Sequence, residues 1–204
     1  MMVSFTQYWR SKHVIKNFFL PLTIFTFIIC ACSTKTDEKS SKISVENVKL
    51  VDSSEGVQLT GDVSVELENT LIEALKKGVP LEFSSEFRIF KSSLFGVKIL
   101  FEKKRRAVLE YHGITRRFSV ILDGEASSAY YESLTEALAA CLSIKDWIFF
   151  PRGILPENME ETTIQVQLML DEEALPRPIS IVASSDESWQ LSSGWVDVYV
   201  GASF

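Results

Sequence analysis

The sequence has few of the residues that build metal and nucleophile sites. Its 204 residues include three cysteines and two histidines, and His112 is the only histidine after residue 31. One histidine cannot supply an H-E-x-x-H zinc site or a two-histidine iron site, and a set of cysteine ligands is missing too. The motifs G-x-S-x-G, S-x-x-K, G-x-x-x-x-G-K and G-x-G-x-x-G do not occur. We therefore expect no catalytic residues, no metal and no cofactor.

A hydrophobic run long enough to cross a bilayer is also missing. Residues 18–31 are fourteen positions without a charge, interrupted by Pro21, whereas a spanning helix needs about 20 apolar residues. The preceding segment is basic and contains no acidic residue; its cations are Arg10, Lys12 and Lys16. This order of a basic and then an apolar segment is typical of an export signal.

The end of the apolar segment, FIICACS, contains two cysteines. Ala31 before Cys32, with two isoleucines upstream, resembles the lipobox of bacterial lipoproteins, in which the cysteine thiol receives a diacylglyceryl group and becomes the new N-terminus. A thiolate suits this reaction because it is a good nucleophile near neutral pH. Cys30 would leave with the signal peptide. The alternatives are an uncleaved anchor and an ordinary cleaved signal.

These features divide the chain into three parts. Residues 1–31 are the predicted lipoprotein signal peptide, residues 32–43 the lipidated cysteine and a polar tether, and residues 44–204 a single β-rich domain. The tether spans roughly 17–20 Å as a coil and at most about 40 Å when extended. The domain is therefore expected to work close to the membrane surface.

The processed chain is acidic. Three of the 21 basic residues precede Cys32, so 18 remain against 27 acidic residues and the formal charge is −9. This charge argues against nucleic acid as a partner and against an electrostatic grip on anionic lipid. Attachment to the membrane would come from acyl chains on Cys32, each buried methylene contributing about 0.8 kcal/mol. Cys141 would be the one free thiol.

Alternation of apolar and polar residues predicts half-buried strands at residues 57–67, 79–89 and 163–170. Residues 105–122 predict a hairpin with a four-residue loop from His112 to Thr115, which pairs Leu109 with Phe118. This assigns His112 to a turn. Further strand candidates are residues 45–51, 97–102, 126–131, 144–149, 179–183 and 195–200.

Two short helices interrupt the strands. Asn69 is the expected cap of the first helix, and Gly78 is expected to end it. Ser133 and Glu136 form the S-x-x-E capping box of the second, whose apolar stripe includes Cys141. The fold class is therefore mainly β with minor α, an antiparallel β-sandwich-like domain with two short helices.

Several polar and aromatic groups are candidates for contacts. The basic run Lys103, Lys104, Arg105 and Arg106, with Arg116 and Arg117 across the hairpin, either binds an anionic partner or is a solvated hairpin end. Trp189 either packs or binds a partner, whereas Trp195 is assigned to the core. Two acidic clusters are either solvated loops or the carboxylates of a glycan hydrolase; they are Glu157, Glu160 and Glu161, and Asp171, Glu172 and Glu173.

Four segments carry a family resemblance: LIEALKKGVPLEFSSEFRIF, YHGITRRFSVILDG, LTEALAACLSIKDW and LDEEALPRPISIVASSDESWQLSSGW. Together they resemble the proteobacterial domain-of-unknown-function family numbered forty-three ninety, over about residues 44–200. The resemblance implies a single exported envelope domain without an assigned activity, so it supplies no catalytic residues.

The sequence thus predicts an uncharacterised lipid-anchored envelope protein that faces the periplasm. Ser33 after Cys32 favours the outer over the inner membrane. The preferred function is a non-enzymatic module that binds another envelope protein near the membrane surface. The alternatives are a carrier or sensor of an apolar ligand, suggested by fourteen phenylalanines, and the glycan hydrolase.

The first prediction concerns the anchor. In cells fed a fatty-acid analogue, wild-type protein should incorporate the label and Cys32→Ala should not, because the acyl chains attach through that thiol. Cys30→Ala should keep the label, since this residue leaves with the signal peptide. Equal labelling of wild type and Cys32→Ala would refute the prediction that the protein is anchored through Cys32.

Overall fold

A computed structural model describes residues 41–53, 56–94, 96–125, 127–145, 147–156, 159 and 161–200. The predicted signal peptide, Cys32 and the tether up to residue 40 lie outside these residues. Lys39–Phe204 form one compact unit. The first strand begins at Lys42, two residues before the predicted start of the domain.

Most of the secondary-structure elements along the chain are strands. The elements are β1 (Lys42–Asp52), β2 (Val57–Glu66), α2 (Asn69–Lys76), β3 (Leu81–Ser93), β4 (Gly96–His112), β5 (Arg117–Leu122), β6 (Ala129–Tyr131), α3 (Leu134–Cys141), β7 (Phe149–Phe150), η1 (Arg152–Ile154), β8 (Thr162–Leu170), α4 (Arg177–Ala183), η2 (Glu187–Trp189), β9 (Val196–Asp197) and β10 (Tyr199–Val200).

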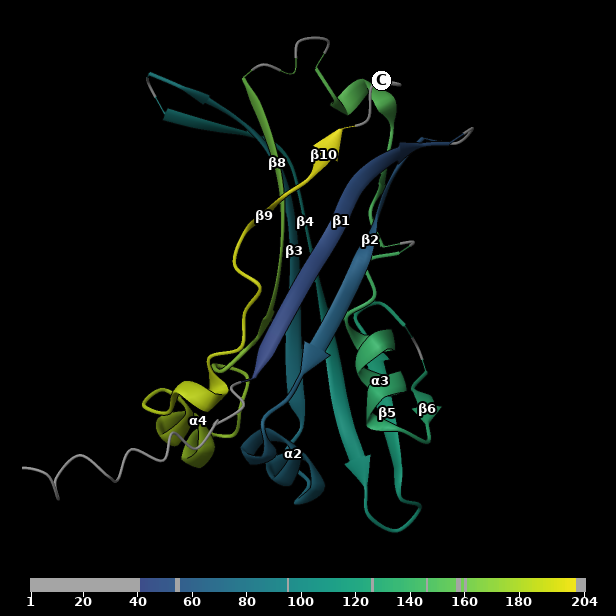
Figure 1. The fold of residues 1–204 in the computed structure, drawn as a ribbon, viewed down its shortest axis with the longest axis vertical. Helices are drawn as coiled ribbons and strands as arrows, with labels where there is room; N and C mark the ends of the chain where they lie inside the picture. The colour runs from purple at the N-terminus through teal and green to yellow at the C-terminus, as the bar shows by residue number, and fades with distance from the viewer. Residues whose placement is uncertain are drawn as a thin grey trace, which may run out of the picture. The chain divides into compact units, whose positions relative to one another are not determined.

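The described strands form two sheets. One has the order β10-β1-β2-β7 and the other β6-β5-β4-β3-β8-β9. Neighbouring strands are antiparallel, except that β10 runs parallel to β1. The β1–β2 hairpin crosses in front of β8, β3 and β4 (Figure 1). The predicted mainly β, sandwich-like fold is confirmed.

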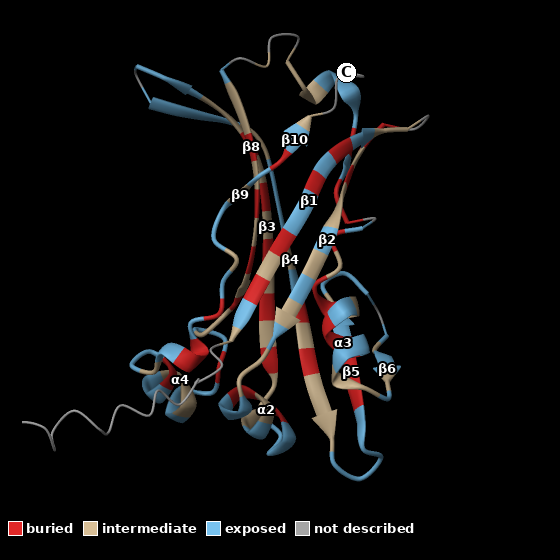
Figure 2. Ribbon diagram, in the orientation of Figure 1, coloured by how far each residue is buried: buried red, intermediate tan, exposed pale blue. Residues whose placement is uncertain are grey.

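One apolar core joins the two sheets. Leu50 and Leu59 from the first sheet belong to the same buried cluster as Phe87 and Val166 from the second. Along β3 the odd-numbered residues from Leu81 to Ile89 are buried and the even-numbered ones are half-buried. Figure 2 shows this alternation along β1, β3 and β4. The strands therefore have one core face and one wetter face, as their patterns predicted.

The two predicted helices form, and one of their two predicted caps is correct. Ser133 Oγ accepts a hydrogen bond from the backbone N–H of Glu136 at 3.2 Å, as the capping box predicted. The Asn69 cap was wrong: Glu68 occupies the cap position of α2 without a side-chain hydrogen bond. Gly78 follows α2 with a φ of 90°, a left-handed value that suits glycine at a helix end.

The predicted hairpin forms with a different register. Its loop has four residues, 113–116, one position later than predicted, so Leu109 pairs with Val120 and His112 is the last residue of β4. Each residue of β4 thus pairs with a residue of β5 two positions later than predicted. Because side chains alternate with a period of two, this shift keeps every side chain on its predicted face. Arg116 adopts a φ of 55° in the loop. In addition, β4 joins two strand candidates into one strand of 17 residues.

The strand predicted at residues 179–183 was wrong. This segment belongs to α4, a third α-helix in the described part of the chain, which begins directly after Pro176 and has Pro178 in its first turn. Proline suits that position because its fixed φ is helical and no hydrogen bond from its nitrogen is needed there. The strand predicted at 144–149 is mostly loop, although Ile144 and Ile148 are fully buried.

A second prediction tests the core. Phe87→Ala should lower the free energy of unfolding by about 3–5 kcal/mol, because Phe87 is fully buried and its ring lies 6.1 Å from those of both Phe101 and Phe150. The matched control is Leu94→Ala, whose side chain is fully exposed and whose cost should stay within about 0.5 kcal/mol. Urea unfolding of both variants measures the difference. Similar costs would contradict the assignment of Phe87 to the core.

Candidate functional site

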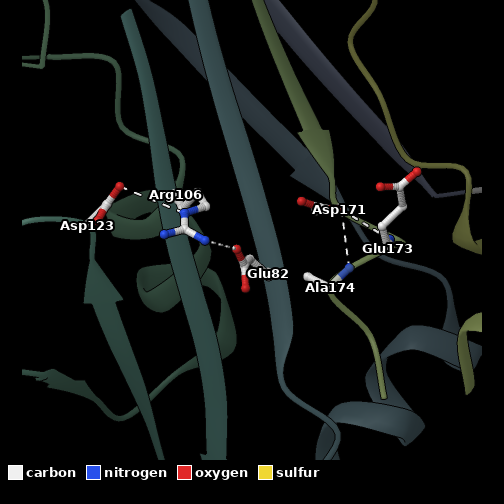
Figure 3. Close-up of polar contacts among 6 residues, drawn as sticks. All are labelled: Glu82, Arg106, Asp123, Asp171, Glu173 and Ala174. Carbon is white, nitrogen blue, oxygen red and sulfur yellow. Dashed lines mark hydrogen bonds and ion pairs between the residues drawn. The ribbon is translucent and has the colours of Figure 1, made fainter. Parts of the chain in front are cut away.

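The basic run Lys103–Arg106 does not form one patch, because alternate side chains of β4 leave opposite faces of the sheet. Lys104 and Arg106 lie on the outer face and pair with acids. The Nζ of Lys104 is 2.9 Å from Glu86, whose hydrogen bond and charge raise the pKa of Lys104. Arg106 lies 3.6 Å from Glu82 and 3.8 Å from Asp123 (Figure 3).

Lys103 and Arg105 instead tie β4 to the loop before β7. Lys103 donates to the carbonyl of Trp147 at 2.8 Å. Arg105 donates to the carbonyl of Ser143, and its guanidinium lies 5.0 Å from the centre of the Trp147 ring. Burial lowers the pKa of Arg105. The basic run is therefore divided between two faces, and Lys103 and Arg105 make structural contacts. Binding of a partner by these residues stays a prediction.

Arg116 and Arg117 do not join the basic run either. Arg117 pairs with His112, six positions along β4 from Arg106. At about 3.3 Å per residue the two groups are roughly 20 Å apart. The side chain of Arg117 contacts Glu132 at 3.2 Å.

The two tryptophans differ in exposure. Trp189 is 4% exposed, so its packing interpretation holds, and its role in binding a partner stays a prediction. Trp195, which the sequence assigned to the core, is 36% exposed. It directly precedes the two-residue strand β9 at the edge of the six-stranded sheet.

Trp195 belongs to a stack of three side chains on the outer face of the six-stranded sheet. The guanidinium of Arg88 lies 3.6 Å from the centre of the Trp195 ring and 4.9 Å from that of Phe90. We name Phe90, Arg88 and Trp195 the Arg88 stack. Cation–π contacts of this kind are worth about 0.5–2 kcal/mol, and they hold the three groups side by side.

Hydrogen bonds fix the Arg88 stack in place. Gln165 Oε1 accepts from Arg88 Nε at 3.2 Å and from Arg88 Nη2 at 2.7 Å. The amide nitrogen of Gln165 then donates to Asp197 at 2.8 Å. The neutral side chain of Gln165 thus orients the guanidinium of Arg88. None of these hydrogen bonds joins Arg88 to a carboxylate. Tryptophan and arginine dominate the energy of protein interfaces, so this stack is the best candidate for a binding surface.

A second exposed apolar feature adjoins the stack. The β3–β4 hairpin extends past its neighbours, and Figure 1 shows its tip projecting from the rest of the unit. We name the described residues 91–94 and 96–98 the arm. Leu94 at its tip is 100% exposed and Val97 is 65% exposed. The sequence predicted a strand from residue 97 but did not predict that these side chains are exposed, because the same apolar residues would also suit a buried strand.

His112 lies beside two groups that superficially resemble a catalytic set. Its Nε2 is 2.8 Å from Ser119 Oγ and 4.0 Å from Glu110 Oε2. A serine–histidine–acid site needs the serine and the acid on different ring nitrogens, whereas both are near Nε2 here. Ser119 is also only 1% exposed. The arrangement therefore does not fit nucleophilic catalysis.

The described members of the two acidic clusters do not converge. Glu161 precedes β8 and Asp171 follows it, and nine intervening residues separate them by roughly 30 Å. A glycosidase needs its two carboxyl groups about 5–10 Å apart. Asp171 instead accepts the N–H groups of Glu173 and Ala174 at 3.1 and 3.3 Å (Figure 3). Glu157 and Glu160 lie outside the described residues.

Cavities open at the surface of the described chain in at least three places. The first, about 630 Å³, lies at the β4–β5 turn between Tyr111, His112 and Tyr130. Two others of about 450 Å³ lie between β2 and α3 and between α2 and α4. None of these three lies between the sheets, where the buried side chains form one continuous cluster.

Cys141 is fully buried, as its place on the apolar stripe predicted, and burial raises the pKa of its thiol to about 12. Among the described residues, no three or more histidine, cysteine or acidic side chains are grouped to hold a metal ion. The helices within that part of the chain are all too short or too polar to cross a bilayer.

Comparison with known proteins gives one match. The model of the family described as Domain of unknown function (DUF4390) matches residues 40–198. Neither a curated protein nor a solved structure matches the chain. The match spans most of the 204 residues and almost all of the two sheets. The chain therefore belongs to the DUF4390 family.

Proposed function

We propose that the protein is a non-enzymatic binding module, lipid-anchored through Cys32 in the bacterial cell envelope, which holds a protein partner on the Arg88 stack. The observation that carries this proposal is the exposed indole of Trp195, 3.6 Å from an arginine that Gln165 orients. Such a preformed group loses little conformational freedom on binding.

The partner is inferred to be an envelope protein. The Arg88 stack offers flat aromatic area and one cation, which suits polypeptide side chains better than the phosphates of nucleic acid, since the chain as a whole is acidic. Lys104, a cation on the same face of the neighbouring strand β4, is already paired with Glu86 and Glu102.

The anchor supports a location near the membrane. The leader and Cys32 resemble a lipoprotein signal, and Ser33 favours the outer membrane. The first described residue, Ser41, is held to the compact unit because its Oγ accepts the backbone N–H of Glu68 at 2.8 Å. The tether between Cys32 and this point is therefore short, and it keeps the module at the periplasmic surface of the membrane.

The glycan hydrolase gains no support, because it needs converging carboxylates and Glu161 and Asp171 lie at opposite ends of β8. The carrier of an apolar ligand has one feature in its favour, the cavity of about 450 Å³ between β2 of the first sheet and α3. This cavity opens at the surface, and the Arg88 stack remains the better defined site.

The third prediction tests the Arg88 stack. In crosslinked cells, a partner protein that copurifies with wild type should be lost with Trp195→Ala. Truncation of a central interface tryptophan costs about 2 kcal/mol or more, which is roughly a thirtyfold loss of affinity.

Tyr199→Ala is the matched control, because Tyr199 is an aromatic side chain that is 77% exposed on the other sheet. This variant should retain the partner. Equal capture by wild type and Trp195→Ala would refute the stack as the binding surface, and so would equal losses in both variants.

A further inference from the structure

Beyond Lys91, the arm has no neighbouring strand on either side in the described part of the chain. On one edge, β8 pairs with β3 only as far as Lys91. On the other edge, β5 pairs with β4 only from Ala107 onward. Beyond these points the hairpin is a two-stranded ribbon, which ends at the pair Ser93 and Gly96. Isolated ribbons of this kind are marginally stable in water.

The arm exposes apolar side chains instead of hiding them. Leu94 is 100% exposed, Val97 is 65% exposed, and Ile99 at the base is 55% exposed. Val97 pairs with Ser92 and Ile99 with Phe90, so both lie on the face of the sheet that carries the Arg88 stack. A fully exposed leucine at a projecting tip gains free energy when another apolar phase takes it out of water.

The charge of the arm differs from that of the rest of the chain. Residues 87–101 contain three basic residues and no acidic residue, although acidic residues outnumber basic ones overall. Two of the cations, Lys91 and Lys98, stand directly opposite each other across the ribbon. Like charges in that arrangement repel. An anion between or beside them relieves the repulsion.

We propose that the arm inserts its tip into the surface of an anionic phospholipid bilayer. Leu94 would enter the boundary of the acyl chains, and Lys91 and Lys98 would contact the phosphates, which is the division of roles seen in interfacial membrane segments. A second copy of the chain fits less well, because pairing two arms edge to edge would gather four lysines.

This inference goes beyond the proposed function and does not depend on Cys32. It adds a second contact with the membrane, made by the folded unit itself. The Arg88 stack lies at the base of the arm, six residues or roughly 20 Å from Leu94 along the strand, so insertion would leave Trp195 outside the lipid and free for a protein partner.

The fourth prediction uses the unit Lys39–Phe204, which is compact and has its own core. It should cosediment with vesicles of phosphatidylethanolamine and phosphatidylglycerol more than with vesicles of phosphatidylcholine alone. Leu94→Asn should lower the partition coefficient about tenfold, because a leucine side chain no longer leaves water. Ile114→Asn is the matched control: Ile114 is equally exposed, at the β4–β5 turn, and its loss should change nothing.

A polarity-sensitive dye shows which part of the unit enters the lipid. The dye is attached to Ser93→Cys at the arm or to Thr115→Cys at the β4–β5 turn. Cys141, the other thiol of this unit, is buried and unreactive. With anionic vesicles the emission at position 93 should shift to shorter wavelength, and the emission at position 115 should not.

Absence of vesicle binding, or equal binding by wild type and Leu94→Asn, would overturn the inference. A dye shift at position 93 that appears without vesicles and grows with protein concentration would also overturn it and assign the arm to a second copy. Loss of partner capture with Trp195→Ala is independent of these outcomes, so this inference and the proposed function can fail separately.

Discussion

The alternation of side chains along the β3–β4 hairpin is the constraint on which the other features of this structure depend. The two strands pair from Leu81 with Leu109 to Ser93 with Gly96, and the buried residues of β3 hold that register against the opposite sheet. A slip of one residue would turn the whole core face toward water. The register therefore decides which side of the sheet each polar residue occupies.

Two results follow from this one register. It divides the basic run of β4 into Lys103 and Arg105, which hold the loop before β7, and Lys104 and Arg106, which pair with acids on the outer face. It also brings Arg88 to the outer face, opposite Gln165 of β8. Because Gln165 is bonded to Asp197, the C-terminal segment is held there and Trp195 completes the stack.

The unequal lengths of the strands give the unit two different ends. Since β3 and β4 are longer than β8 and β5, their shared tip becomes an arm. The beginning of β1 and the β4–β5 turn lie toward the opposite end of the hairpin (Figure 1). The chain thus enters at one end, while the stack and the arm, which carry both proposed contacts, lie toward the other.

The sequence determined the strands with clear alternation, the two helices with apolar stripes, the burial of Cys141 and the family, because these depend on local pattern. The tertiary structure alone decided the rest. Residues 179–183 became a helix after Pro176 although their β-branched side chains favour a strand. Trp189 was buried and Trp195 exposed because an indole suits either place, and only the neighbouring elements decide whether it is covered on one side or on all sides.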